Sequence, residues 1–360
     1  MIVLFTSNEK GGILQFTIKL LNTLIKMNYE AKAFIPQGSI VTINDTIKDK
    51  VVFYRKKKTI NIYNKELKSI CDRIRQLRPD LLWLCDATIQ STEISSLIGE
   101  KIKQILTIHD GGIVHSSYAK GVRKTIRRYI EKTMEKKSLK VVHKVMLLSE
   151  ETKNIFISCY PMYKSKIIVL NLGAHVPEVD GQKPIEQLPD KYFLFFGRID
   201  KYKGIICLLN AYKLYSGDVG LVIAGNGEMT VEEKQALKEE TRCIYINRYI
   251  KDEEMVWLFE NAYALVLPYL EATQSGIIPI SYTFGKPVIV SNVKGLTQFV
   301  ENEITGFICK EEKDYVNAFR LVESDPTLFS EKCKEYYDKH LEWEKNIHKL
   351  FQQLKINKKQ

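Results

Sequence analysis

The chain has 360 residues, of which 45% are apolar and 27% charged, and its formal net charge is +11. This composition is typical of a soluble globular protein, and the length fits two domains of ordinary size. No run of about 18 apolar residues occurs and no signal-peptide pattern opens the chain, so neither a transmembrane helix nor a signal peptide is expected. The seven cysteines stand singly, which predicts reduced thiols in a cytoplasmic protein rather than disulfides or a zinc site.

The first half of the chain alternates short apolar runs with helical patterns. This alternation predicts a parallel sheet covered by helices. Strands are expected at residues 1–6, 31–36, 51–54, 80–85, 104–108, 145–149 and 167–170, and helices at 13–27, 65–77 and 151–159.

Two features in this half follow expected strands. Gly11 and Gly12 lie between the first strand and the first helix, which fits either a nucleotide-binding loop or an ordinary tight turn. His109 follows the strand of residues 104–108 and begins the sequence His-Asp-Gly-Gly. A histidine at the carboxyl end of a parallel strand can position or polarise a ligand. A histidine with a structural role is the alternative.

Positive charge is concentrated in the same half. Residues 1–180 hold 30 Lys and Arg against 17 Asp and Glu, whereas residues 181–360 hold 24 against 26. The excess is densest in residues 118–144, which hold ten Lys or Arg and two Glu. Apolar residues recur there at helical spacing, flanked by Arg123, Lys124, Arg127 and Arg128.

This basic segment has three interpretations. A basic amphipathic helix can lie on an anionic membrane surface. The apolar stripe can equally pack on the domain core while the cations face water. Nucleic acid is not expected as a partner, because no nucleic-acid motif or interleaved aromatic residues occur.

Residues 173–190 are rich in Gly, Pro and polar residues, which predicts a linker between domains. The second domain begins with a buried strand at 192–196, and the loop after it carries Arg198 and Lys203 in front of a helix. Two cations at a helix start, at the carboxyl edge of a sheet, suit a diphosphate.

The stretch from Tyr263 to Ser291 predicts a complete βαβ unit. A strand at 263–267 is followed by a loop carrying Glu271, by a helix that opens at Gln274-Ser275-Gly276 and by a strand at 288–290. The loop lies where open α/β sheets bind ligands, and the helix start suits an anion.

The Gly-Arg-x-x-x-x-Lys-Gly and Glu-Ala-x-Gln-Ser-Gly motifs resemble the donor site of retaining glycosyltransferases of family 4 (glycosyl transferases group 1). This chain resembles a branch in which Ser275-Gly276-Ile277 replaces the Phe-Gly-Leu turn. Pro279 stands where the family has its second Glu, eight residues after Glu271.

The resemblance implies a GT-B fold, in which two Rossmann-like α/β domains with parallel sheets face each other across a cleft. It implies an acceptor-side domain at residues 1–175 and a donor-nucleotide domain at 190–342. The last helix, within 343–360, would pack back onto the first domain.

The resemblance also implies an activity. The chain would move a sugar from a nucleotide-diphosphate sugar, expected to be a UDP-sugar, to a saccharide or lipid-linked acceptor in bacterial surface polysaccharide biosynthesis. No Asp-x-Asp signature stands at a strand end, so the expected hexosyl transfer is metal-independent and needs no cofactor. With the basic first half, this places the expected enzyme in the cytoplasm or at the inner face of its membrane.

The resemblance assigns residues to this activity. The implied catalytic residues are His109, Arg198, Lys203 and Glu271. The implied donor-binding residues are Gly11, Gly12, Arg198, Lys203, Gly225, Tyr249, Ile250, Glu271, Ser275, Gly276 and Ile277.

Two other classes of function stay open. One is a catalytically silent, membrane-associated protein that binds nucleotide sugars and lost turnover with the second Glu. The other is a GT-B-like sugar-nucleotide epimerase, which would lack the pairing of Arg198 and Lys203 with a Glu loop.

Overall fold

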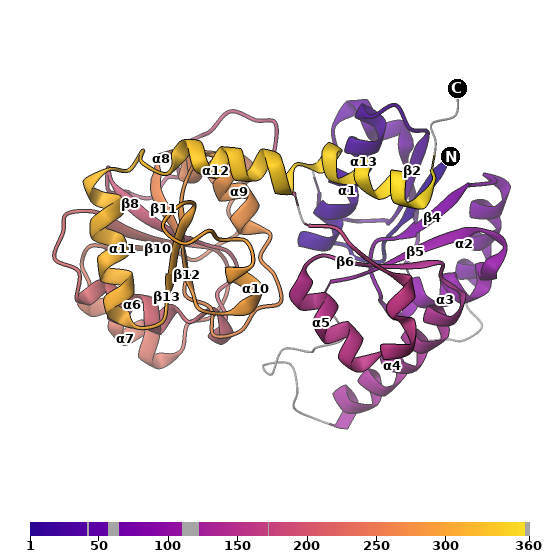
Figure 1. Cartoon of the computed structure of the whole chain (residues 1–360), viewed down its shortest axis with the longest axis horizontal. Coiled ribbons are helices and arrows are strands. Elements are labelled where there is room, and N and C mark those ends of the chain that lie inside the picture. Colours follow the sequence, from indigo (N-terminus) through magenta and orange to yellow (C-terminus); the bar gives the residue numbers. More distant parts are fainter. Residues whose placement is uncertain (42, 57–64, 110–121, 172, 357–360) are drawn as a thin grey trace. The chain divides into compact units, whose positions relative to one another are not determined.

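The computed structural model describes residues 1–41, 43–56, 65–109, 122–171 and 173–356, and side chains of residues 122–128 are outside the described part. The chain forms two compact units. Unit 1 comprises Met1–Asn171 and Trp343–Gln360, and unit 2 comprises Leu172–Glu342. Each unit is a parallel sheet with helices packed on it (Figure 1). The expected pair of parallel-sheet α/β domains is confirmed.

Unit 1 contains a seven-stranded sheet in the order β3-β2-β1-β4-β5-β6-β7. Its strands are β1 (Ile2–Phe5), β2 (Ala31–Pro36), β3 (Val51–Tyr54), β4 (Leu81–Leu84), β5 (Lys103–Ile108), β6 (Lys144–Leu147) and β7 (Ile167–Val169). Its helices are α1 (Gly12–Lys26), α2 (Lys65–Gln76), α3 (Ile89–Ile98), α4 (Val122–Val141), α5 (Glu150–Cys159) and α13 (Trp343–Leu354), with short helical turns η1 (Asp45–Lys50), η2 (Gly99–Lys101) and η4 (Pro161–Lys166).

Strand β4 shows why this sheet is apolar on both faces. Its four residues, Leu-Leu-Trp-Leu, are all buried. Leu82 and Leu84 belong to the core cluster that includes residues of α2 and α3, whereas the Trp83 ring lies 6.4 Å from the Phe351 ring of α13. Because successive side chains point to opposite faces, a sheet covered on both sides has strands that are continuously apolar.

Unit 2 contains a six-stranded sheet in the order β10-β9-β8-β11-β12-β13. Its strands are β8 (Tyr192–Phe196), β9 (Gly220–Ala224), β10 (Cys243–Ile246), β11 (Ala262–Leu267), β12 (Val288–Ser291) and β13 (Gly306–Cys309). Its helices are α6 (Ile205–Lys213), α7 (Val231–Glu239), α8 (Asp252–Asn261), α9 (Ile277–Thr283), α10 (Lys294–Thr297), α11 (Glu312–Ser324) and α12 (Ser330–Tyr336), with short turns η5 (Lys201–Lys203) and η6 (Tyr337–Leu341).

Strand order in both sheets reverses beside the first strand of the unit. In unit 1, β1 lies between β2 and β4, and in unit 2, β8 lies between β9 and β11. Loops that leave the carboxyl ends of two such strands diverge to opposite faces of the sheet and leave a crevice between them, which is where open α/β sheets bind ligands. Ligand sites are therefore expected at the β1–β4 edge in unit 1 and at the β8–β11 edge in unit 2.

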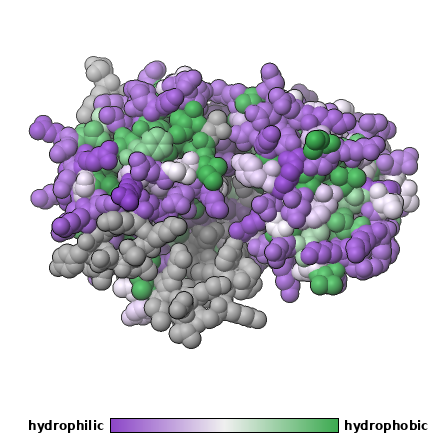
Figure 2. All heavy atoms as spheres, turned by 180° about the vertical axis from the view of Figure 1, so that it is seen from behind, coloured by the Kyte–Doolittle hydropathy of each residue, from purple (hydrophilic) through white to green (hydrophobic). Residues whose placement is uncertain are grey.

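The face drawn in Figure 2 is mostly hydrophilic where its residues are described, with apolar residues in smaller patches. Within the described ranges, no helix has both the length and the apolar character needed to span a membrane.

Candidate functional site

The loops after β8, β9 and β11 are held together at the carboxyl edge of the unit 2 sheet. The Gly197 amide donates to the Ala224 carbonyl oxygen at 3.0 Å, and the Ile199 amide donates to the Asn226 carbonyl oxygen at 2.9 Å. Gly225 has φ +150°, and a Cβ there would overlap the Gly197 carbonyl oxygen. Only glycine allows this close approach, so Gly225 supports the loop that carries Arg198.

A second glycine joins the β8 loop to the β11 loop. Gly204 has φ +66°, and a Cβ at this position would overlap the Pro268 carbonyl oxygen. The Leu270 amide donates to the Tyr202 carbonyl oxygen at 2.8 Å. Residues 197–204 and 268–276 therefore form one connected surface at the place where the strand order reverses.

Lys203 lies against aromatic rings from both loops. Its Nζ is 3.6 Å from the centre of the Tyr269 ring and 4.8 Å from the centre of the Tyr202 ring. Burial lowers the pKa of Lys203 to about 8. The Tyr202 hydroxyl and the Asp200 charge raise this pKa in part, and the Arg198 charge lowers it further. The rings attract the ammonium through their electron-rich faces, but among the described residues no carboxylate lies within ion-pair distance of it.

Arg198 lies on the same surface and is more exposed. Its guanidinium is 3.4 Å from the Tyr202 hydroxyl oxygen and 3.7 Å from the Asp200 carboxylate. Its side chain is 54% exposed, so the guanidinium can still meet a ligand from solvent. The structure thus brings Arg198 and Lys203 together around Tyr202.

Glu271, Ser275 and Gly276 follow on the β11 loop. Glu271 is half-buried, Ser275 is buried and Gly276 is exposed. Burial raises the pKa of the Tyr269 phenol, and the neighbouring Ser275 hydroxyl lowers it. Neither hydroxyl completes a hydrogen bond of normal geometry with a described residue. A buried hydroxyl in this state is stabilised when a polar ligand atom reaches it.

The helix after this loop is short. Helix α9 begins at Ile277 with Gly276 as its N-cap and has no acidic residue in its first turn. Its seven residues give only a short run of aligned peptide dipoles. The cationic side chains of the β8 loop are therefore the stronger electrostatic feature.

Tyr249 and Ile250 occupy different environments. Tyr249 is 64% exposed, whereas Ile250 is 7% exposed and belongs to the unit 2 core. The neighbouring Arg248 forms paired hydrogen bonds to Glu186 and to Glu254 at 2.6–2.9 Å. These bonds hold the pKa of both carboxyl groups below the usual range and fix the corner that presents Tyr249.

The unit 1 candidates lie at the other reversal of strand order, between β1 and β4, and on the neighbouring strand β5. His109 directly follows β5, and its Nε2 lies 2.9 Å from the Cys85 carbonyl oxygen. A carbonyl only accepts, so Nε2 carries the proton in this contact. The imidazole also meets the Phe16 ring edge to face at 5.4 Å. Asp110 to Gly112 of the His-Asp-Gly-Gly motif are outside the described residues.

Gly11 and Gly12 form the exposed start of α1. Gly11 has φ +83°, and helix α1 has no side-chain cap. The loop therefore leaves its first helical amides open to solvent or a ligand.

Sequence reasoning missed Asp86, which is 1% exposed beside this loop. Its carboxylate accepts hydrogen bonds from residues after β1 and from residues at the start of α3. The available signal was an acidic residue directly after a buried strand, followed by the helix-capping sequence Ala-Thr-Ile-Gln-Ser. Tyr202 and Tyr269, which surround Lys203, were also missed.

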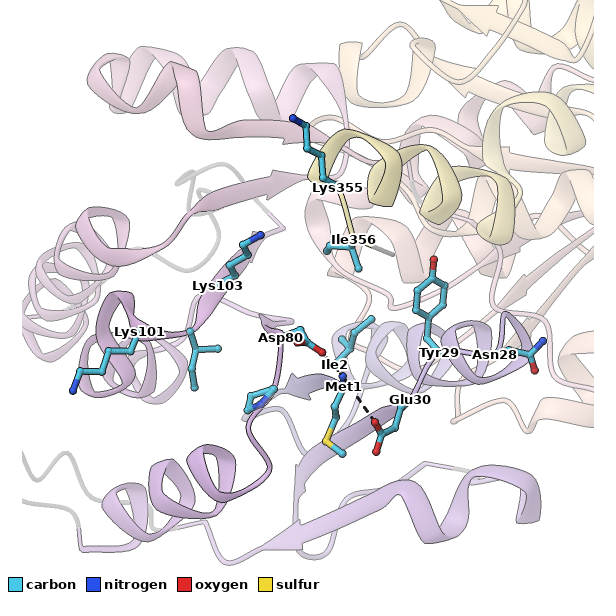
Figure 3. A pocket seen from close by; sticks show the side chains of 12 residues that line it. Met1, Ile2, Asn28, Tyr29, Glu30, Asp80, Lys101, Lys103, Lys355 and Ile356 are labelled. Atoms are coloured by element: carbon cyan, nitrogen blue, oxygen red, sulfur yellow. Dashed lines mark hydrogen bonds and ion pairs between the residues drawn. The ribbon is translucent and has the colours of Figure 1, made fainter. Parts of the chain in front are cut away.

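A pocket at the opposite, amino-terminal edge of the unit 1 sheet has other chemistry (Figure 3). The amino group of Met1 contacts the Asp80 carboxylate at 2.6 Å and the Glu30 carboxylate at 3.9 Å. Lys101, Lys103 and Lys355 also line this pocket. It lies away from the carboxyl edge that carries the candidate residues, so we assign no donor or acceptor role to it.

In the described part of the chain, no group of three or more His, Cys, Asp or Glu side chains is arranged to hold a metal ion. The cations of the β8 loop are the groups that can neutralise a bound anion.

Comparison with known proteins agrees with this geometry. Residues 178–340 match the family model described as Glycosyl transferases group 1. This match covers most of unit 2, including both loops around Lys203. The expected resemblance to that group is confirmed for these residues, while family 4 and the Glu-Ala-x-Gln-Ser-Gly branch stay predictions.

Two curated relatives match part of the chain. D-rhamnosyltransferase WbpZ of Pseudomonas aeruginosa is 33% identical over 118 residues, which are 32% of this chain and 30% of that protein. O-antigen chain mannosyltransferase C of Escherichia coli is 26% identical over 155 residues, or 41% of each protein. The matches thus span less than half the length of these relatives.

A solved structure resembles the whole chain. The Anabaena protein Alr3699/HepE, in complex with UDP and glucose, has a TM-score of 0.70 and 12% identity, covering 98% of this chain and 99% of that one. At this identity the likeness shows the fold alone, which is GT-B.

Proposed function

We propose that the protein is a retaining glycosyltransferase that moves a sugar from a nucleoside-diphosphate sugar to a saccharide or lipid-linked acceptor. The observation that carries the proposal is the Lys203 ammonium, which lies half-buried against two tyrosine rings beside Arg198 and the Glu271 loop. A buried charge is costly unless an opposite charge or hydrogen bonds compensate it. A diphosphate supplies both.

The same cations can accelerate cleavage of the bond between the sugar and the diphosphate. Negative charge grows on the diphosphate as the bond between it and the sugar breaks. Lys203 and Arg198 are fixed before the reaction, so they stabilise this charge more strongly in the transition state than in the bound donor. We infer a reaction in which these two side chains, rather than a metal ion, neutralise the leaving group.

Other residues have supporting roles in the proposed reaction. Glu271 contacts sugar hydroxyl groups or the positive charge that develops on the sugar ring. Ser275 and the Gly276–Ile277 amides bind polar donor atoms, and Tyr249 packs on the base. In unit 1, His109 and the Gly11–Gly12 loop bind and position the acceptor. Retention follows if the acceptor attacks the face that the diphosphate leaves.

The donor and the acceptor are proposed from chemistry and similarity. A UDP-sugar is proposed because the Anabaena protein of like fold was solved with UDP and glucose. A surface polysaccharide is proposed as the product because the partial relatives include an O-antigen mannosyltransferase.

Contact with an anionic membrane is proposed from the charge of α4. Arg123, Lys124, Arg127 and Arg128 are on this helix, but their side chains are outside the described residues. Further along α4, Lys132, Lys136 and Lys140 are exposed. These lysines continue the positive charge to the end of the helix and suit a surface of anionic headgroups.

The test is sugar transfer from a panel of UDP-, GDP- and dTDP-sugars to a lipid extract or to defined saccharides. We expect transfer with one donor and a product that keeps the anomeric configuration of that donor. Arg198→Ala should lower kcat by tens to hundreds of times, because one charge-assisted phosphate contact is worth about 2–4 kcal/mol. Arg198→Lys keeps the positive charge but loses the planar guanidinium, so it should restore only part of the rate.

Other outcomes contradict parts of the proposal. Nucleotide-sugar binding without transfer would identify a silent binding protein, and inversion of configuration would refute retention. Full loss of activity in EDTA would refute neutralisation of the leaving group by Arg198 and Lys203 alone.

A further inference from the structure

Asp86 lies at the reversal of strand order in unit 1. Strands β1 and β4 are paired in parallel, and Asp86 lies two residues beyond the end of β4. The Cys85 amide still donates to the Phe5 carbonyl oxygen at 2.8 Å. Asp86 is thus the first residue past the last β1–β4 hydrogen bond, at the place where loops diverge.

One carboxylate oxygen of Asp86 holds the residues that follow β1. Asp86 Oδ2 accepts from the Thr6 hydroxyl at 2.6 Å, the Ser7 amide at 2.9 Å and the Asn8 side-chain amide at 2.9 Å. Three donors on one oxygen specify its position closely, and charge-assisted hydrogen bonds are stronger than neutral ones. The segment that leads to Gly11 and Gly12 is therefore anchored at its buried end.

The other oxygen faces the start of α3. Asp86 Oδ1 accepts from the Thr88 amide at 3.2 Å, the Thr88 hydroxyl at 2.7 Å and the Ser91 hydroxyl. Thr88 is itself the N-cap of α3 and accepts from the Ser91 amide. The helix therefore has its own cap, and capping α3 does not account for the three bonds that Asp86 makes to the β1 segment.

The same segment also fixes His109. The carbonyl that meets His109 Nε2 belongs to Cys85, the residue directly before Asp86. Tyr54 and Lys56, from β3 and the residues after it, add bonds to the Thr6 and Ser7 carbonyl oxygens at 2.9 and 2.6 Å. His109 and the Gly11–Gly12 loop are thus both placed relative to Cys85–Asp86.

We propose that Asp86 is a positioning residue that holds residues 7–12 and His109 in the arrangement that receives the acceptor. This inference rests on the proposed function. Asp86 is buried and touches no substrate. It acts by fixing groups that do. Displacing a reacting geometry by about 1 Å can cost a rate factor of roughly 100.

The experiment compares three full-length variants. Thr6→Val and Asp86→Asn weaken the Oδ2 contacts. Ser91→Ala leaves those contacts in place, removes contacts to Asp86 Oδ1 and to the Thr88 hydroxyl, and is the matched control. For the first two we expect acceptor kcat/KM to fall at least about tenfold, and the affinity for the nucleotide, measured by calorimetry, to fall by a smaller factor. Ser91→Ala should keep parental kinetics, even where its thermal stability falls as much as that of Thr6→Val.

Hydrogen exchange of the amides of residues 9–12 gives a readout that needs no turnover. The Asn8 amide is left out because it donates to the Thr6 hydroxyl itself. The amides of residues 9–12 should exchange faster in Thr6→Val than in Ser91→Ala. If the parent transfers no sugar, the proposed function fails and exchange still decides whether Asp86 holds the loop. Parental exchange and kinetics in Thr6→Val, or equal losses in Ser91→Ala, would overturn the positioning role.

Discussion

At the scale of single residues, the proposed role of Lys203 in binding the diphosphate has a cost in folding stability. Burial lowers its pKa to about 8 from the ordinary value of 10.5, so the folded chain holds the proton less tightly than the unfolded chain. Between pH 8 and 10.5 the unfolded state binds more protons, and stability rises with pH across that window. Below pH 8 the full cost of burying the charge is present.

Lys203→Met should therefore stabilise the protein while it lowers activity. At pH 7 we expect a free energy of unfolding higher by up to about 3 kcal/mol, the equivalent of the pKa difference, together with a loss of kcat of tens to hundreds of times. Thermal unfolding and initial rates measure the two effects. A variant that is both inactive and less stable would show that Lys203 has a structural role.

The pH dependence of nucleotide binding belongs to the same side chain. With its pKa near 8, Lys203 loses its proton in the free protein as pH rises above that value. A bound diphosphate favours the protonated form and raises this pKa, so nucleoside-diphosphate affinity should fall up to about tenfold per pH unit above pH 8.

Calorimetric titrations of UDP at pH 7, 8, 9 and 9.5 measure this effect. Lys203→Met should bind weakly and with little change over the same range. An affinity of the parent that stays constant to pH 9.5 would contradict the assignment of Lys203 to the diphosphate.

At the scale of elements, the β8 and β11 loops should depend on the absence of a side chain at Gly204. Gly204→Ala must relieve both a positive φ and an overlap with the Pro268 carbonyl oxygen. We expect unit 2 to lose at least about 1–3 kcal/mol of stability, and nucleotide binding to weaken because Tyr269 and Tyr202 separate.

Gly276→Ala is the control for folding, because a Cβ at Gly276 meets nothing within 4 Å and its φ is −71°. Its thermal unfolding should match that of the parent. Equal stability of the two variants would show that the contact between the loops is dispensable.

The strands could be predicted from the sequence because of what they bury. Strands at 192–196 and 263–267 were expected, and the structure has Tyr192–Phe196 and Ala262–Leu267. A parallel strand covered on both faces has no polar side, so its apolar run is visible without knowledge of its neighbours. The position of Lys203 before a helix was visible for a similar, local reason.

The surroundings of these residues could not be predicted, because they come from distant parts of the chain. Tyr269 reaches Lys203 only because β11 pairs with β8. The bonds to Asp86 come from two segments that are about 80 positions apart in the sequence. The resemblance implies that Ile250 binds the donor, yet its side chain is almost fully buried.

At the scale of the whole molecule, positive charge is concentrated in the part of the chain that forms unit 1. All of the positive excess is in residues 1–180, which contain nearly all of unit 1. Such a field attracts an anionic surface over about one Debye length, about 8 Å at physiological salt. An interaction of this kind weakens as salt is added, whereas insertion of apolar side chains would not.

Replacing Arg123, Lys124, Arg127 and Arg128 together by Gln should release the protein from anionic vesicles. Each cation near such a surface is worth about 1 kcal/mol, so four should lower the partition coefficient by two to three orders of magnitude at low salt, by roughly tenfold for each 1.4 kcal/mol.

The control replaces four exposed lysines elsewhere in unit 1, Lys48, Lys65, Lys68 and Lys101. Its net charge is the same, so equal loss in both variants would assign the attraction to overall charge. Co-sedimentation with phosphatidylserine vesicles at 50 and 300 mM salt measures binding, and parental binding by the α4 variant would refute the membrane role of this helix.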